Sequence, residues 1–214
     1  EWLYQLLSPE KNVTRSPRSY NSQIGVPLSV WNLDERSEVG LFEAGISEPG
    51  EMEALQSVIQ PTIGVFTCLG DAHQENFTSY EQKCLEKLKL FKDAKVLVYD
   101  MDDARVVGCV NRSAFKGEYF AWSRQRRDVP LYIASVEKRE AETVVSYIYK
   151  GKEAACSIPF IDEASLANSV SCLAVCLHLG MSPETIAARM AVLEPVAMRL
   201  EVKEGRSGCT LIND

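Results

Sequence analysis

Residues 63–91 read IGVFTCLGDAHQENFTSYEQKCLEKLKLF, and this stretch decides the fold class. Residues 63–66 form a short apolar run typical of a buried strand, whereas residues 79–91 carry apolar side chains at helical spacing. His73 stands between the two, where the strand ends. In open α/β sheets, ligands bind at that edge of the strands. The sequence therefore predicts a binding site around His73.

The alternation of strands and helices extends on both sides of this stretch. We predict helices over 1–8, 22–32, 50–60 and 79–93, and strands over 12–14, 39–42, 62–68 and 95–99. Strands that alternate with helices imply right-handed crossovers and a parallel sheet. We therefore expect an α/β fold with a mostly parallel sheet flanked by helices.

The middle of the chain has a different period. Between Tyr119 and Ile158 apolar and polar residues alternate with period two, and YKGK at 149–152 is a hairpin turn in which Gly151 supplies the positive φ. We expect a small antiparallel sheet from about 118 to 158, set on or beside the parallel one. Helices over 163–179 and 182–193 and strands over 199–203 and 208–213 are predicted to follow.

Composition limits the class of protein. A chain of 214 residues can bury one sizeable core, and its formal charge of −7 argues against a general partner among nucleic acids or membrane surfaces. No apolar stretch approaches the length of a membrane span, and no signal-peptide pattern opens the chain. The seven cysteines are scattered and mostly lie in apolar runs, which favours buried free thiols. We expect a cytoplasmic monomer without membrane insertion.

Polar residues gather where strands end. Glu43, His73 and Lys87 could meet at one sheet edge and hold a divalent cation together with phosphate oxygens. Each also has an ordinary interpretation: a solvated loop acid, a helix-capping histidine and a surface lysine. Spacing alone leaves the function open.

Four segments in order carry a family resemblance: YNSQIGVPLSVWNL at 20–33, FEAGISEPGEM at 42–52, PTIGVFTCLGDAHQENFTSYEQKCLEKLKLF at 61–91 and MRLEVKEGRSGCTLIND at 198–214. Together they resemble the central ATP-binding domain of the Mur ligases, which is similar to P-loop NTPases. The resemblance covers essentially the whole chain. It is strongest to the members that add D-alanyl-D-alanine to UDP-N-acetylmuramoyl-tripeptide, some of which are fused to an alanine racemase.

The resemblance implies roles for individual residues, with ATP and Mg²⁺ as cofactors. Glu43 matches a magnesium-binding glutamate, His73 the histidine that holds a second magnesium, and Lys87 a carbamylated lysine that acts as a carboxylate-like ligand. His73 and Lys87 are thereby the implied catalytic residues. The implied substrate and nucleotide contacts are Asn21 and Ser22 on the substrate side, Asn168 at adenine, Arg199 at the phosphates and Asp214 at the ribose.

The sequence departs from the family pattern in two places. Ala164 and Ser165 stand where the family has a histidine-asparagine pair, and no G-x-x-x-x-G-K-[ST] motif occurs. We therefore expect residues 1–214 to be a fragment of the central domain that is inactive alone, with the phosphate loop upstream and the C-terminal ligase domain absent.

For the intact enzyme, the resemblance implies amide ligation through an acyl phosphate in peptidoglycan precursor synthesis. The open alternatives are a folylpolyglutamate or cyanophycin ligase of the same superfamily, a non-catalytic nucleotide-binding module, and a metal-independent α/β enzyme.

Overall fold

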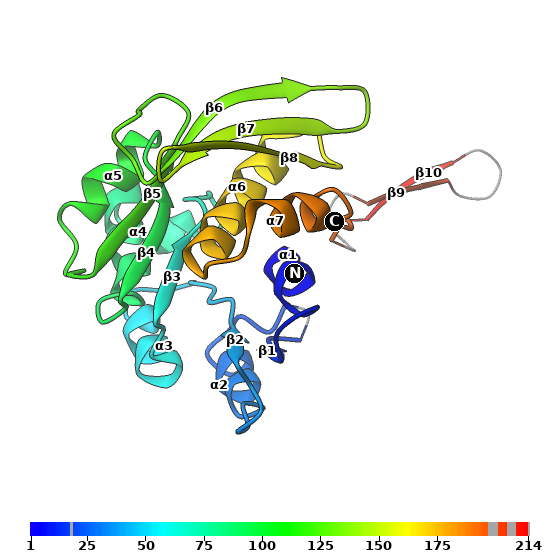
Figure 1. The fold of residues 1–214 in the computed structure, drawn as a ribbon. Helices are drawn as coiled ribbons and strands as arrows, with labels where there is room; N and C mark the ends of the chain where they lie inside the picture. Colours follow the sequence, from blue (N-terminus) through cyan, green and yellow to red (C-terminus); the bar gives the residue numbers. More distant parts are fainter. Residues whose placement is uncertain (18, 197–200, 205–208, 214) are drawn as a thin grey trace.

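The computed structural model describes residues 1–17, 19–196, 201–204 and 209–213. Its centre is a six-stranded sheet with helices on both faces, a three-layer α/β/α arrangement. In Figure 1 the sheet separates α4 and α5 on one side from α6 and α7 on the other. The α/β prediction with a mostly parallel sheet and flanking helices is confirmed.

The six strands lie in chain order across the sheet: β3 (Ile63–Phe66), β4 (Val96–Asp100), β5 (Glu118–Ser123), β6 (Leu131–Lys138), β7 (Thr143–Tyr149) and β8 (Lys152–Ile158). The pairs β3–β4, β4–β5 and β5–β6 are parallel, whereas β6–β7 and β7–β8 are antiparallel. The carboxyl ends of β3, β4 and β5 therefore lie at one edge, as the prediction of a site at His73 requires.

The predicted second sheet over about 118–158 is wrong in its placement. β5 pairs in parallel with β4, and the antiparallel strands β6 to β8 continue the same sheet. Period-two alternation reports that a strand has one buried face, but it does not reveal the neighbour with which the strand pairs. The hairpin turn is confirmed, since Lys150 and Gly151 have φ of 50° and 73°.

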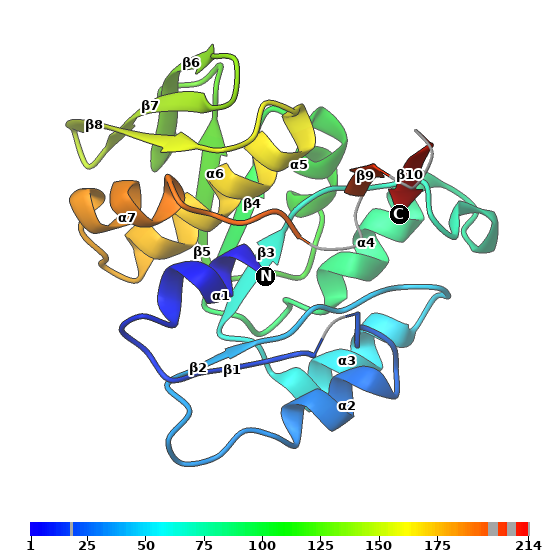
Figure 2. The ribbon, with the colours of Figure 1, turned by 90° about the vertical axis from the view of Figure 1, so that its right-hand side faces the viewer.

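Two further pairs of strands stand apart from the central sheet. β1 (Val13–Arg15) and β2 (Val39–Leu41) pair in parallel, and β9 (Glu201–Glu204) and β10 (Thr210–Asn213) pair antiparallel. Figure 2 shows β1 and β2 beside α2 and α3, below the central sheet in that view. The strands predicted in the first half are thus present, but the first two do not belong to the main sheet.

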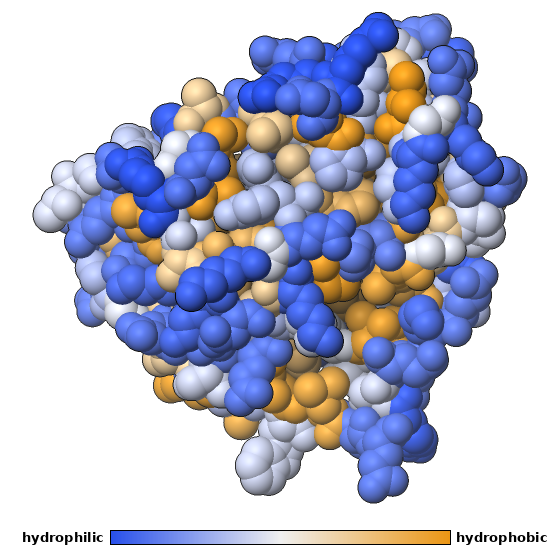
Figure 3. Space-filling model, turned by 60° about the vertical axis from the view of Figure 1, so that its left-hand side comes forward, coloured by the Kyte–Doolittle hydropathy of each residue, from blue (hydrophilic) through white to orange (hydrophobic). Residues whose placement is uncertain are grey.

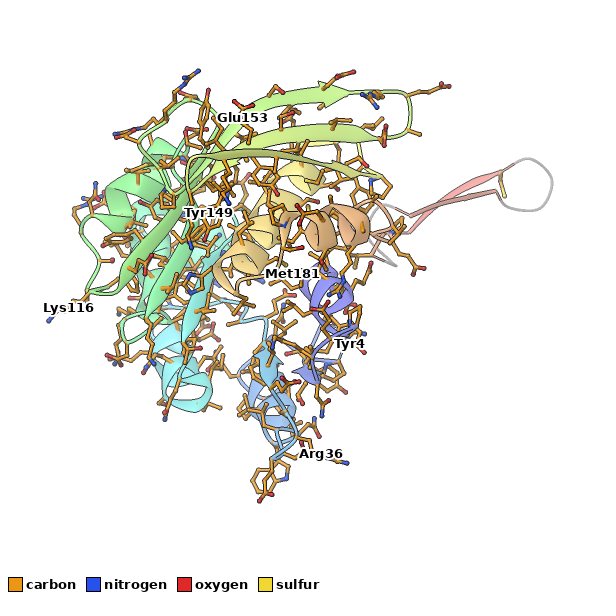
Figure 4. All side chains as sticks on the ribbon, in the orientation of Figure 1. Tyr4, Arg36, Lys116, Tyr149, Glu153 and Met181 are labelled. Carbon is orange, nitrogen blue, oxygen red and sulfur yellow. The ribbon has the colours of Figure 1, made fainter. Side chains whose placement is uncertain are left out.

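The helices agree with the sequence except at two places. They are α1 (Trp2–Leu7), α2 (Gly25–Val30), α3 (Glu51–Ile59), α4 (Tyr80–Lys89), α5 (Ala104–Val110), α6 (Glu163–His178) and α7 (Pro183–Met190), with a 3₁₀ turn η1 at Gln74–Asn76. The unpredicted elements are α5, whose Asp103 side chain caps the amides of Arg105 and Val106, and η1. Met181, labelled in Figure 4, lies in the short connection between α6 and α7.

Two apolar clusters pack on the two faces of the sheet. One lies between the sheet and α1, α6 and α7, and includes Leu131, Ile158 and Leu173. The other joins the opposite face to α3, α4 and α5, and includes Leu88 and Leu97. Both faces of the central strands are therefore buried, and function is left to the strand ends and loops.

None of the helices in the described part of the chain has the length and apolar character that crossing a bilayer requires. The face drawn in Figure 3 mixes hydrophilic and hydrophobic side chains, with several hydrophobic ones toward the bottom of the view. Among the cysteines, Cys84, Cys109, Cys156 and Cys176 are buried thiols, as expected, while Cys68 is exposed.

Candidate functional site

The candidate site is built from two loops and one helix. The Glu43 loop (residues 42–50) follows β2, and the His73 loop (residues 67–79) follows β3 and leads into α4. The helix α4 carries Lys83 and Lys87 one turn apart. Hydrogen bonds tie these three pieces together, so residues far apart in sequence share one edge of the fold.

Glu43 is exposed and held from one side by Asn21. The Asn21 side-chain amide donates to Glu43 Oε1 at 3.0 Å, and the Gly45 backbone amide donates to the Asn21 carbonyl at 2.8 Å. A Cβ on Gly45 would lie 3.1 Å from the Asn21 side chain, so the loop approaches Asn21 closely because residue 45 is glycine. One carboxylate oxygen of Glu43 is thus oriented by an amide.

His73 occupies an unusual backbone conformation. Its φ is 58°, in the left-handed region, and its side chain is exposed. Such a conformation costs a non-glycine residue on the order of 1–3 kcal/mol, so the surrounding contacts must hold it. Around it, the Gln74 amide donates to the Asp71 carbonyl at 3.0 Å, and the Tyr80 hydroxyl donates to Asp71 Oδ1 at 2.6 Å.

Lys87 points back over the beginning of the His73 loop. Its Nζ lies 3.4 Å from the Cys68 carbonyl oxygen and 5.9 Å from the centre of the Phe66 ring. Burial is the main cause that lowers the pKa of Lys87 below its usual value, and the nearby charge of Glu43 acts in the opposite direction. The Glu43 contribution is the smallest of the named causes, and among the described residues no hydrogen bond or ion pair joins Glu43 to Lys87.

Two contacts join the loops and the helix directly. The Asn76 side-chain amide donates to the Ser47 carbonyl at 3.0 Å and so links the His73 loop to the Glu43 loop. The Gly50 amide donates to Glu86 Oε2 at 2.9 Å, which links the start of α3 to α4. The positions of Glu43, His73 and Lys87 are thus coupled through neighbouring residues.

Glu43, His73 and Lys87 lie on two loops and a helix that contact one another, but none of the three side chains bonds to another in the described residues. Within the described ranges no hydrogen bond or ion pair connects the His73 imidazole to either residue. Those ranges also contain no group of three His, Cys, Asp or Glu side chains placed to hold a metal ion. Convergence of all three residues on one cavity stays a prediction.

Lys83 is the residue that the sequence interpretation missed. Only 2% of Lys83 is exposed, and its Nζ donates to the carbonyls of Gly70, at 2.7 Å, and of Ala72. The available signal was its spacing, since Lys83 lies four residues before Lys87 and so on the same face of the helix.

The other predicted site residues are placed as follows. The Ser22 hydroxyl accepts the Gly25 amide at 3.1 Å, so it helps to begin α2. Asn168 is exposed on the second turn of α6, whose first residue, Glu163, pairs with Arg124 just after β5. Arg199 and Asp214 lie outside the described residues.

Two described cavities lie away from Glu43, His73 and Lys87. One of about 390 Å³ lies between β6 and α6 at the ends of β4 and β5, and Asp100, Asp102 and Arg124 contribute to its lining. Burial raises the pKa of Asp100 to about 6. A larger one of about 650 Å³ is lined by Arg127, Lys150 and other residues near the β7–β8 turn.

The fold is an α/β core with loops at the carboxyl edge of its parallel strands, and comparison with known proteins identifies the family. The model of the Mur ligase middle domain matches residues 1–176, so the chain belongs to the Mur ligase family. The family expected from the four sequence segments is thereby confirmed.

Three relatives illustrate the similarity. The chain is 26% identical over 220 residues to the UDP-N-acetylmuramoyl-tripeptide–D-alanyl-D-alanine ligase of Bacillus subtilis (strain 168), a match that covers 100% of this chain and 46% of the relative. The MurF structure from Acinetobacter baumannii has a TM-score of 0.86 at 18% identity, covering 100% of this chain and 47% of that one. The MurF ligase of Thermotoga maritima, solved in complex with ADP, has a TM-score of 0.81 at 22% identity, covering 100% and 49%.

The chain spans about half the length of these relatives, since the match covers 46% of the Bacillus subtilis ligase. The structural likenesses, at 18% and 22% identity, establish the fold.

Proposed function

We propose that the protein containing this chain is an ATP-dependent carboxylate–amine ligase of peptidoglycan precursor synthesis. It joins D-alanyl-D-alanine to UDP-N-acetylmuramoyl-tripeptide in the cytoplasm. The observation that carries the proposal is the match to the Mur ligase middle domain, together with the hydrogen bonds that join the Glu43 loop to the His73 loop and to α4.

The reaction proceeds in two steps. A carboxylate oxygen of the tripeptide attacks the γ-phosphorus of ATP, ADP leaves, and an acyl phosphate forms. The amine of D-alanyl-D-alanine then attacks the acyl carbon, inorganic phosphate leaves, and the amine loses a proton to give the amide. Because both steps move negative charge, most of the catalysis lies in positioning and charge neutralisation.

Mg²⁺ fits the donor chemistry of this edge if Lys87 is carbamylated. When bound, Mg²⁺ neutralises phosphate charge. Glu43 supplies a carboxylate already oriented by Asn21, and His73 an exposed imidazole. Unmodified, the Lys87 ammonium would repel a cation. Its lowered pKa favours the neutral amine, which can add to CO₂ to give a carbamate and release a proton.

The remaining roles follow the family pattern. Asn168 contacts the adenine, Arg199 the phosphates and Asp214 the ribose, while Asn21 and Ser22 lie on the side of the peptide substrate. Asn168 is suited to this role because it is an exposed amide near the start of α6.

The test is a ligation assay on the full protein that contains this chain. Phosphate release and peptide product are followed with ATP, Mg²⁺, UDP-N-acetylmuramoyl-tripeptide and D-alanyl-D-alanine, and we expect turnover that requires all four. Folate with glutamate, and aspartate with arginine, serve as competing substrates. Turnover with either of these instead of the muramoyl peptide would overturn the proposal.

Carbamylation has its own readout. With ¹³C-bicarbonate we expect a carbamate signal by NMR that disappears in Lys87→Ala and persists in Lys95→Ala. Lys95 is an exposed lysine that directly precedes β4, away from the two loops and α4.

A further inference from the structure

Lys83 is a buried lysine with backbone carbonyls as its hydrogen-bond partners. It is 2% exposed, although lysine is almost never fully buried unless it is paired. No carboxylate pairs with it in the described residues; its Nζ donates to the carbonyl oxygens of Gly70 and Ala72 and lies 5.9 Å from the centre of the Phe77 ring. All of these partners belong to the His73 loop.

The contacts form a regular series along that loop. Lys87 binds the carbonyl of Cys68, and Lys83 binds those of Gly70 and Ala72. The accepting carbonyls belong to every second residue of the loop, and the two donating lysines are four residues apart on one face of α4. Two turns of a helix thus hold the loop from the end of β3 to the residue before His73.

The last of these contacts lies beside the strained residue. Ala72 directly precedes His73, whose φ of 58° is unfavourable for a residue with a Cβ. The His73 side chain is exposed, so packing does not fix it. The direction of the imidazole therefore depends on the loop backbone. Lys83 binds the carbonyls of Gly70 and Ala72 before His73, and the Gln74 amide after His73 donates to the Asp71 carbonyl.

We propose that Lys83 is a positioning residue: by binding the carbonyls of Gly70 and Ala72, it holds the His73 loop in the conformation that presents the imidazole to a divalent cation. This inference rests on the proposed function for the role of His73. Lys83 acts through the loop backbone, because its Nζ binds carbonyl oxygens of that loop.

The experiment compares Lys83→Met with Lys95→Met in the full protein. Methionine keeps the length and apolar stem of lysine but removes all three donors, while the Lys95 side chain is exposed and makes no described bond. Hydrogen exchange read by mass spectrometry reports the amides of Gln74, Asn76 and Phe77, which are hydrogen-bonded within the loop. Measured without metal, hydrogen exchange reports how firmly Lys83 holds the His73 loop, independently of any reaction.

The second measurement uses Mn²⁺ as the metal probe. In protein with labelled histidines, Mn²⁺ broadens the His73 imidazole signals, which are assigned with His73→Gln. We expect Lys83→Met to raise loop exchange at least ~10-fold and to raise the half-broadening Mn²⁺ concentration by ~10-fold or more, as loss of a partner that orients a ligand commonly does. Lys95→Met should change neither.

Unchanged loop exchange in Lys83→Met would overturn the proposal. So would faster exchange with an unchanged Mn²⁺ response, since Lys83 would then have a structural role only, and so would a wild-type His73 that does not respond to Mn²⁺. If Lys83→Met does not fold, Lys83→Leu, which also lacks donors, is measured against the same thresholds. A protein whose His73 responds to Mn²⁺ but which forms no amide would contradict the proposed function and leave the role of Lys83 standing.

Discussion

The central sheet has a parallel half, β3 to β6, and an antiparallel half, β6 to β8. Helices cover both halves, but the connections between their strands differ. In the parallel half, β3 leaves the sheet through the 13-residue His73 loop, whose carbonyls and side chains are held by α4. In the antiparallel half, Lys150 and Gly151 turn β7 directly into β8, and inward residues such as Leu131 and Ile158 are fully buried.

The difference follows from how strands are connected. A parallel pair needs a long crossover, which brings loops to the carboxyl edge and offers room for polar groups. An antiparallel pair can close with two residues and leaves little besides the strands themselves. The carboxyl edge of the parallel half therefore carries the polar loops, whereas the antiparallel half packs its last strand, β8, against α7. The four predictions that follow test this difference.

Lys87→Ala should show the largest effect, a loss of ligation activity with little change in stability. We expect ligation by the full protein to fall by ~10²-fold or more, because the variant cannot form the carbamate that is proposed to help neutralise phosphoryl charge. The change in unfolding free energy should stay within about 1 kcal/mol, since Lys87 makes one long hydrogen bond at 3.4 Å. Steady-state turnover and urea denaturation measure the two. Retained turnover would contradict the assignment of Lys87.

Leu131→Ala, in the antiparallel half, should lower stability and leave turnover unchanged. Leu131 is 0% exposed, and truncation of such a side chain costs about 2–5 kcal/mol. Urea unfolding should show this loss, while turnover per folded molecule stays near that of the wild type. Ile161→Ala is the matched control, because that aliphatic side chain is 51% exposed and its loss should cost under about 0.5 kcal/mol. A large loss of turnover in folded Leu131→Ala would show that the two halves are coupled.

Gly151→Ala should destabilise the hairpin by about 1 kcal/mol, because φ at this position is 73°. The same substitution at Gly108, inside α5, should stabilise by roughly 0.5–1 kcal/mol, since a Cβ there approaches no atom closer than 3.9 Å. Thermal unfolding compares the two variants. Equal effects at both positions would mean that backbone conformation does not determine the stability of the turn.

Asp100→Asn should give the smallest effect and one that depends on pH. The folded-state pKa of Asp100, about 6, lies above its ordinary value of 3.8, so ionisation destabilises the fold. The penalty is absent below about pH 4 and fully present above about pH 6. Asparagine removes it and keeps the acceptor for the Asp102 amide at 2.8 Å.

We therefore expect Asp100→Asn to stabilise by up to about 1 kcal/mol at pH 7, allowing for partial exposure, and by nothing at pH 4. Urea midpoints at the two pH values measure this. A gain of the same size at both would show that Asp100 titrates normally in the folded protein.

Much of the fold could be read from local patterns. Helical spacing predicted α3, α4, α6 and α7. At the start of α7, Ser182 accepts the Thr185 amide and Pro183 follows it, which is a common way for a helix to begin. The helix α5 escaped prediction because its run ARVVGCV is rich in β-branched residues, which favour strands. Its Asp103 cap was the missed signal.

The candidate site was predictable in part. Glu43 and His73 were identified by their places after strands, Lys87 by its place on the following helix, and all three by family resemblance. The structure joins the elements that carry them through Asn76 and Glu86. Lys83, Asn76 and Glu86 were not identified, because each acts through a backbone group in a distant segment. Because almost every residue type has the same backbone amide and carbonyl, the sequence does not indicate which residue a side chain will bind through the backbone.

By itself, the sequence determined the order and kind of the elements, the two-residue turn at Lys150 and Gly151, and the family to which the chain belongs. These depend on local periodicity, on the conformational freedom of single residues and on short motifs. Only the tertiary structure decided that β6 to β8 extend the parallel sheet, that Lys83 is buried and Lys87 half-buried, and that Asn21 orients Glu43. The physical reason is that strand pairing, burial and carbonyl hydrogen bonding are set by which segments meet in space, and one-dimensional spacing does not contain that information.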